Sequence, residues 1–202
     1  MSEVARRRGS YAKTANRRAE ILDAAVKVFA ESGFHGGTIR GIAERVGISQ
    51  AGLLYYFANK AELLEAMLTQ RDVLAGESVG PGLPTGLAML DALVHLTAYN
   101  ATTPGLVALY AVLSGEGTAA DHPGHGYFSA RYARVHGLFE EAIRVGQQRG
   151  ELRADVDPEL AARTLIALSD GLQIQWLYED GAFDMTGPIK AYVETLLPGA
   201  RC

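Results

Sequence analysis

Residues 38–60 read Thr-Ile-Arg-Gly-Ile-Ala-Glu-Arg-Val-Gly-Ile-Ser-Gln-Ala-Gly-Leu-Leu-Tyr-Tyr-Phe-Ala-Asn-Lys, and this stretch decides the fold of the first third of the chain. Thr38 can cap a first helix, because its hydroxyl oxygen can accept from a free backbone N–H group. Gly47 can end that helix, since glycine adopts the left-handed conformation without a steric penalty. Ser49 can then cap a second helix. The pattern predicts two short helices joined by a tight turn.

The second predicted helix has two different faces. Leu53 and Phe57 are four residues apart, so both should face the interior. The outer side then carries Gln50, Ala51, Gly52, Leu54 and Tyr55. Small residues let a helix backbone approach base edges closely, and an amide side chain can donate to these edges and accept from them. We therefore expect a helix-turn-helix that inserts into the major groove of double-stranded DNA.

A further helix is expected to begin at Lys60, with Asn59 as its cap and Glu62 completing a capping box. A cation in the first turn opposes the helix dipole. Lys60 is explained if a DNA phosphate lies just beyond this helix start, where the dipole and the free N–H groups also attract an anion. The alternative is a solvated surface lysine.

This stretch resembles the DNA-binding region of the tetracycline-repressor (TetR) family of bacterial transcription regulators. The positions that carry the resemblance are Thr38, Arg40, Ile42, Ala43, Gly47, Ile48, Ser49, Leu53, Tyr56, Phe57, Lys60 and Leu63. The match continues back through Ile21, Ala24, Ala25 and Phe29, without an insertion. It covers the first third of the chain strongly, and the helical layout expected for the remainder also fits the family.

The resemblance implies a DNA-binding role for Thr38, Arg40, Ser49, Gln50, Ala51, Gly52, Leu54, Tyr55, Tyr56 and Lys60. Arg40 would approach a base edge or a phosphate, and residues 50–52 would lie against bases. The side chains of Tyr55, Tyr56 and Lys60 would hold the DNA backbone.

Leu54 departs from the family pattern, which often has tyrosine there, so a hydroxyl donor to phosphate is missing. The alternative function is therefore a helical small-molecule-binding or scaffold protein without specific DNA recognition. An enzyme is not indicated, because the sequence has no nucleophile elbow, no glycine-rich phosphate loop after a strand and no His/carboxylate motif with metal spacing.

Charge is distributed unevenly along the 202 residues, although the net charge is only −4. Residues 1–60 hold ten Lys/Arg and five Asp/Glu, a balance of +5, whereas residues 61–202 hold nine and eighteen, a balance of −9. A basic head on an acidic body directs one end of the molecule toward a polyanion. Arg6, Arg7 and Arg8 belong to a basic arm that either contacts phosphates or stays solvated.

The sequence also restricts the location of the protein and the kinds of site that it can contain. No run approaches the ~20 apolar residues of a membrane span. Cys202 is the sole cysteine, which excludes intramolecular disulfides and cysteine-rich zinc sites. His122 and His125 have a spacing that can chelate, but the Pro and Gly between them favour a loop. We expect a cytoplasmic protein with no metal and no cofactor.

The whole chain is predicted to be all-α, with a three-helix DNA-binding domain in residues 1–60 and a larger domain in residues 61–202. The first helix should run from about residue 14 to 32. A connecting helix should span residues 60–75 and lead into a Gly/Pro linker at residues 76–86. Further helices are expected at about 85–101, 104–116, 125–148, 158–179 and 186–197.

The last two helices carry more apolar surface than one helical layer needs. The resemblance implies that they pair with their copies in a four-helix bundle of a homodimer. The residues expected at that interface are Leu165, Leu168, Leu172, Ile189, Tyr192, Val193 and Leu196. The alternative is that both helices only complete the core of one chain. A dimer would hold two recognition helices ~34–36 Å apart, as a palindromic site requires.

Aromatic and polar residues of the larger domain suggest a pocket for a small, mostly apolar effector. The candidates are His95, Tyr99, Tyr110 and Trp176, and packing in the core is the alternative for each. The segment 122–135 is similar to the choline-sensing subgroup, a pattern that does not identify a ligand. The combined hypothesis is a ligand-responsive homodimeric regulator, in its simplest form a repressor that the effector releases from DNA.

Overall fold

A computed structural model describes the backbone of residues 2–79 and 82–199, and their side chains except those of residues 2–13, 74, 75 and 77–79. Helices, and no strands, make up the regular structure of these ranges. They are α1 (Ser2–Gly36), α2 (Ile39–Val46), α3 (Gln50–Tyr56), α4 (Lys60–Val79), α5 (Leu87–Ala101), α6 (Pro104–Glu116), α7 (His125–Gln148), α8 (Pro158–Tyr178) and α9 (Thr186–Thr195). Among the described residues, no helix is both long and apolar enough to cross a lipid bilayer.

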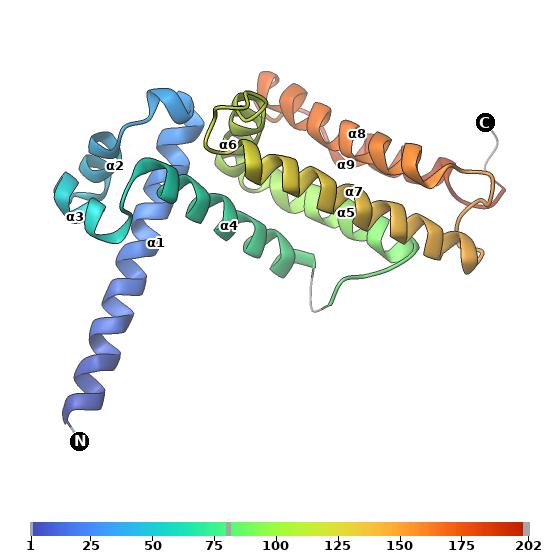
Figure 1. Ribbon diagram of the computed structural model, residues 1–202. Coiled ribbons are helices and arrows are strands. Elements are labelled where there is room, and N and C mark those ends of the chain that lie inside the picture. The colour runs from blue at the N-terminus through green and yellow to red at the C-terminus, as the bar shows by residue number, and fades with distance from the viewer. Residues whose placement is uncertain (1, 80–81, 200–202) are drawn as a thin grey trace.

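The molecule has a small head of α1–α3 and a larger body of α5–α9, joined by α4 (Figure 1). Helix α1 begins at Ser2, about a dozen residues before the predicted start, and the side chains of Arg6, Arg7 and Arg8 lie outside the described residues. Its predicted end is confirmed, because Gly33 leaves the helical conformation with φ 67° and ψ −178°.

The expected caps of the helix-turn-helix are confirmed. The Thr38 hydroxyl oxygen accepts from the Gly41 N–H group at 3.0 Å, and the Ser49 hydroxyl oxygen accepts from the Gly52 N–H group at 3.0 Å. Gly47 adopts the left-handed conformation with φ 76°. Each cap satisfies a backbone donor that the helix itself leaves free, so the turn is specified locally.

Helix α4 is longer than predicted. It continues to Val79, so Gly76 lies inside the helix rather than in the linker. A single glycine costs a helix only about 1 kcal/mol, which does not end it when neighbouring turns are good helix formers. Of the linker expected at residues 76–86, the described residues 82–86 are not helical.

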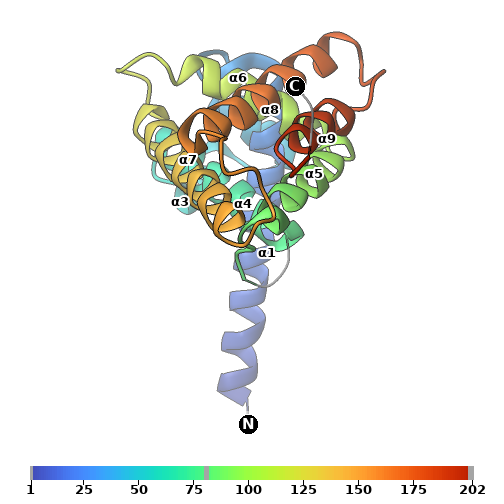
Figure 2. The ribbon, with the colours of Figure 1, turned by 90° about the vertical axis from the view of Figure 1, so that its right-hand side faces the viewer.

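The helices of the body begin and end within about two residues of the predicted positions, which is the usual uncertainty of helix boundaries. At the start of α8, the Asp157 carboxylate accepts from the N–H groups of Glu159 and Leu160, as its cap pattern predicted. Helices α5, α7, α8 and α9 share one apolar core, which includes Leu90, Ile143, Leu165 and Ile189. The end-on view in Figure 2 shows these helices gathered side by side.

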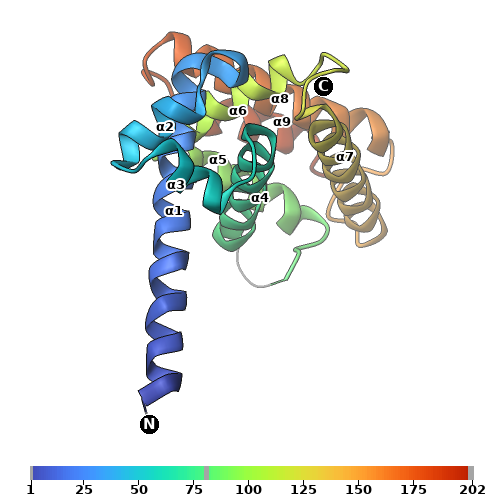
Figure 3. The same ribbon diagram turned by 60° about the vertical axis from the view of Figure 1, so that its left-hand side comes forward.

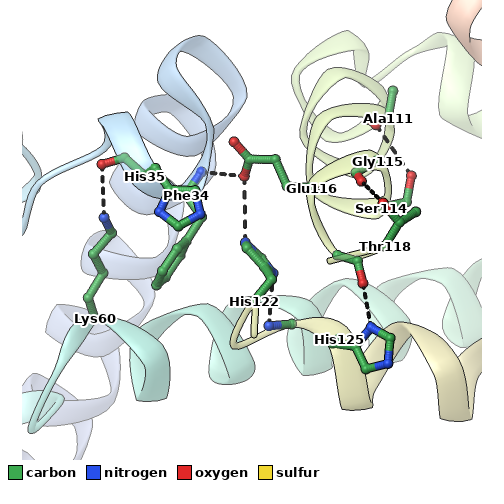
Figure 4. Close-up of polar contacts among 12 residues, drawn as sticks. Phe34, His35, Lys60, Ala111, Ser114, Gly115, Glu116, Thr118, His122 and His125 are labelled. Carbon is green, nitrogen blue, oxygen red and sulfur yellow. Dashed lines mark hydrogen bonds and ion pairs between the residues drawn. The ribbon is translucent and has the colours of Figure 1, made fainter. Parts of the chain in front are cut away.

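One contact fixes the end of α1 against the body. Glu116, at the end of α6, accepts from the backbone N–H group of Phe34 at 2.7 Å (Figure 4). Gly33 makes room for it, since a Cβ atom there would lie 2.1 Å from Glu116 Oε1. Phe34 itself is buried in the core that the head shares with Leu109 and Leu113 of α6. The head and body therefore meet through both apolar packing and a charged acceptor.

We predict that Glu116→Ala lowers the free energy of unfolding by about 1–3 kcal/mol, because the N–H group of the buried Phe34 loses its acceptor. The matched control Glu141→Ala removes an exposed carboxylate from α7 and should change stability by no more than about 0.5 kcal/mol. Chemical denaturation followed by circular dichroism measures both. Equal stability of the two variants would contradict the role of Glu116.

Candidate DNA-binding surface and effector cavity

The outer face of α3 is open to solvent. Gln50, Ala51 and Leu54 are exposed, and Tyr55 is 82% exposed. Leu53 lies on the opposite face and is fully buried. Figure 1 places α3 at the edge of the head, away from helices α5–α9, and Figure 3 brings the side of the head that carries α2 and α3 toward the viewer. The structure thus leaves this face free to approach a flat or grooved partner.

The buried face of α3 is held by the core of the head. Leu53 and Phe57 pack in one cluster with Ile42 of α2 and residues of α1 and α4. The guanidinium of Arg18 on α1 lies 4.1 Å from the centre of the Phe57 ring and donates to the Tyr56 carbonyl oxygen at 3.1 Å. Tyr56 is half-buried, and its ring contacts the Tyr55 ring edge to face at 5.3 Å between centres. Apolar packing, the Arg18–Phe57 contact and the hydrogen bond to Tyr56 therefore hold α3 against the rest of the head.

The two predicted DNA-binding cations have different surroundings. Arg40 is exposed, and its Nε atom donates to Glu44 Oε1 at 2.8 Å. An exposed pair of this kind contributes little to stability, so a phosphate can replace the carboxylate at small cost. Lys60 instead lies over the Phe34 ring, with Nζ 4.3 Å from its centre, and donates to the His35 carbonyl oxygen at 3.4 Å. Burial lowers the pKa of Lys60.

The histidine pair of the α6–α7 loop binds two separate backbone groups. His122 Nδ1 accepts from the Gly124 N–H group at 3.0 Å, and His125 Nδ1 lies 2.9 Å from the Gly117 carbonyl oxygen. The neutral His122 ring therefore carries its proton on Nε2, which is 3.6 Å from Glu116 Oε2 (Figure 4). Within the described ranges, no three His, Cys, Asp or Glu side chains form a group that could hold a metal ion.

The body contains a cavity of about 420 Å³ between α4, α5, α7 and α8, a size typical of small-molecule sites. Most of its wall is apolar and includes Met89, Leu93, Val135, Leu138, Phe139 and Ile166. Its polar residues include Arg71, Tyr110, Arg131, Tyr132, Asp170 and Gln173. An apolar wall with a few buried polar groups is the usual construction of a site that binds and orients an organic molecule.

Several polar groups of the cavity have partners of opposite charge or hydrogen-bond partners. The Tyr132 hydroxyl donates to Asp170 Oδ2 at 2.7 Å. Burial raises the pKa of Asp170, and it also raises the pKa of Tyr132 together with that hydrogen bond. Arg131 forms an ion pair with Asp72, which also binds Arg134 at 2.9 Å. Charged side chains at this depth are rare unless they are paired, and groups with shifted pKa values are concentrated at functional sites.

The structure brings only one of the four predicted effector residues to this cavity. Tyr110 lines it, whereas His95 and Tyr99 lie on α5 with exposed side chains and do not. Trp176 is buried in the core of the body, where its indole lies against Gly181. Sequence reasoning missed Arg71, although a signal existed: Arg71 follows Leu64 and Leu68 at i+7 and i+3, on the buried face of α4.

The residues predicted for the dimer interface lie mostly inside the single chain. Leu165 and Ile189 have no exposed surface, and Leu172, Val193 and Leu196 are also buried, while Leu168 and Tyr192 are half-buried. Buried side chains have little surface to give to a second subunit. The large exposed apolar residues of α8 are instead Leu160, Ile174 and Tyr178.

The fold and these surfaces define an all-helical regulator with an N-terminal helix-turn-helix and a small-molecule cavity. Sequence comparison agrees with this class. The family described as "Bacterial regulatory proteins, tetR family" matches residues 21–67, and that described as "BetI-type transcriptional repressor, C-terminal" matches residues 125–198. The transcriptional repressor KstR2 of Rhodococcus jostii is 31% identical over 189 residues, which are 91% of this chain and 90% of KstR2.

Solved structures share the fold over most of the chain. A transcriptional regulator from Saccharomonospora viridis in complex with choline is 27% identical, with a TM-score of 0.74, and the match covers 89% of this chain and 96% of that one. FadR of Bacillus subtilis in complex with stearoyl-CoA is 21% identical, with a TM-score of 0.71 and coverage of 91% and 99%. The chain belongs to the TetR family of transcriptional regulators. The relatives named above are regulators rather than enzymes.

We predict that His122 lowers the free energy of unfolding as the pH decreases below 6.5. Burial lowers the pKa of His122 from its ordinary 6.5, against the opposing effect of Glu116, while His35 acts in the same direction as burial. As the pH falls below 6.5, the unfolded chain therefore gains a proton that the folded chain does not. This site then removes at most about 1.4 kcal/mol of stability per pH unit, until the pH has passed the lowered pKa.

The variant His122→Asn keeps an acceptor for the Gly124 N–H group and removes the titrating ring. Urea denaturation at pH 7.5 and 5.5 should show a smaller loss of stability in this variant than in the wild type. The exposed His95 provides the control, and His95→Asn should keep the pH dependence of the wild type. The same loss in wild type and His122→Asn would rule out the assignment.

Proposed function

We propose that the protein is a homodimeric, ligand-responsive repressor that leaves a palindromic DNA operator when a mostly apolar small molecule enters the cavity. The observation that supports this most strongly is the open outer face of α3, which a fully buried inner face fixes in position. A helix in this arrangement can enter the major groove without rearrangement of the head. A DNA partner implies that the protein acts in the cytoplasm.

Helix α4 supports a connection between ligand and DNA. Its first half supplies Leu63, Leu64 and Leu68 to the core of the head. Arg71 lines the cavity about 12 Å along the helix from Leu63. A ligand that displaces α4 therefore also displaces the core against which α3 packs. If one conformer binds DNA better and the other binds the ligand better, each partner weakens the other by the same factor.

The exposed side of α8 supports a dimer. Leu160, Ile174 and Tyr178 are spaced i, i+14 and i+18, which places them on one face, with the small residues Ala167 and Gly171 between them. Small residues in such a stripe let two helices approach closely. We propose this face, in place of the buried residues expected from sequence, as the main contact between two copies of the chain.

We predict that Ile174→Glu makes the protein monomeric, because each dimer would bury two carboxylates in an apolar interface. Sedimentation velocity at micromolar concentration measures the change. Val73→Glu, at another exposed apolar residue that lies on α4, should leave the assembly unchanged. A wild-type monomer, or a dimer that survives Ile174→Glu, would refute the proposed interface.

DNA recognition is tested by selection of duplexes from a random library, followed by titration of the enriched duplex at several salt concentrations. We expect an inverted repeat. Arg40→Ala should reduce the log–log salt slope by about 0.9 per chain, since one phosphate contact is lost. Arg144 is the matched control, because it pairs with Glu140 one turn away on α7 as Arg40 pairs with Glu44. No enriched sequence, or equal slopes for Arg40→Ala and Arg144→Ala, would contradict the DNA-binding surface.

A further inference from the structure

Two buried polar groups at the cavity have no hydrogen-bond partner among the described residues. They are Arg71 Nη1 and Gln173 Oε1, and each residue is only 8% exposed. The Asp72 Oδ1 atom is 3.9 Å from Arg71 Nη1, which is beyond hydrogen-bond reach. A buried charged donor without an acceptor is costly, so a ligand group that accepts from Arg71 would bind with a large gain.

A second guanidinium lies at the same end of the cavity. Arg71 and Arg131 both approach the Tyr110 ring, at 4.1 Å and 5.3 Å from its centre. The buried Nε atom of Arg131 also lacks a partner within the described part of the chain. Asp72 balances the charge of Arg131 through their ion pair. Burial, and then the nearby Arg131, lower the pKa of Arg71, against the opposing effects of Tyr110, Tyr127 and Asp72.

The charges around the cavity favour an anionic ligand over a cationic one. Asp170 is the sole carboxylate among the described residues that line it, and Asp170 Oδ2 already accepts from Tyr132. Burial raises the pKa of Asp170, which weakens its negative charge. A cation would therefore meet two guanidiniums and one occupied carboxyl group.

We propose that the cavity binds a small molecule with an apolar body and a single carboxylate head, which accepts from Arg71 and Gln173. The planar fork of a guanidinium matches the two oxygens of a carboxylate. Gln173 can turn its NH₂ group to the same head, since rotation by 180° exchanges the amide O and N positions. Leu93, Val135, Phe139 and Ile166 then cover the apolar body. This inference rests on the proposed function in taking the cavity as the effector site.

Isothermal titration calorimetry of the full-length wild-type protein with octanoate, 1-octanol and octylamine compares three head groups on one tail. Octanoate should bind at least about tenfold more tightly than the other two, because only its head pairs with the guanidinium. Binding of 1-octanol or octylamine as tight as that of octanoate overturns the proposal. So does the absence of octanoate binding.

The variant Arg71→Met removes the guanidinium and keeps an apolar stem of similar length. Its affinity for octanoate should fall at least about tenfold, while its affinity for 1-octanol should change by less than about threefold. Arg134→Met is the matched control, since Arg134 shares Asp72 but does not line the cavity. Circular dichroism verifies folding, and Arg71→Lys, which keeps the charge, should retain part of the octanoate affinity. Unchanged octanoate affinity in Arg71→Met overturns the proposal.

DNA binding provides a separate measurement. Octanoate that binds through Arg71 but leaves operator affinity unchanged would refute the ligand-responsive mechanism and support the carboxylate site. Release of the operator by 1-octanol or octylamine, and not by octanoate, would support the regulator and overturn the carboxylate site. The two proposals can therefore fail independently.

Discussion

The hydrogen bond from the Phe34 N–H group to the Glu116 carboxylate, together with the apolar packing around Phe34, fixes the arrangement of head and body. It joins the end of α1 to the end of α6, at a point where Gly33 has no Cβ atom to block the approach. Beside it, Lys60 lies over the Phe34 ring at the start of α4. Phe34 therefore contacts both Glu116 of α6 and Lys60, the first residue of α4, and α4 continues to the cavity.

This arrangement restricts how the head can move. Because α1 is attached to α6 at Phe34, the whole head would not move together with α4 if α4 were displaced. It changes the packing of Leu64 and Leu68 against the same cluster that holds Leu53 of α3. Packed cores have discrete arrangements and are not continuously deformable, so in the mechanism that we propose a small shift of α4 would change the orientation of α3.

The sequence predicted the helix-turn-helix well because its determinants are local. Thr38, Gly47 and Ser49 each act on backbone groups no more than four residues away, so spacing alone identifies them. The contact of Glu116 with Phe34 spans 82 residues, and its partner is a backbone N–H group, which no side-chain pattern identifies. The exposed face of α8 that carries Leu160, Ile174 and Tyr178 is not identified by the sequence for a similar reason. Periodicity finds apolar faces, but it does not say which face the chain itself covers.

The residues of the cavity are predicted less well from the sequence than those of the helix-turn-helix. The aromatic pattern predicts pocket residues, and Tyr110 is at the cavity, but the exposed His95 and Tyr99 are on another face of α5. The sequence pattern does not single out Arg71, because a charged residue within a helix is usually solvated. Yet a buried guanidinium nitrogen without a hydrogen-bond acceptor, such as Arg71 Nη1, opposes folding, and that cost falls on α4, the helix that connects cavity and head. A ligand that satisfies Arg71 therefore acts on the conformation of α4 directly, through the free energy of that one group.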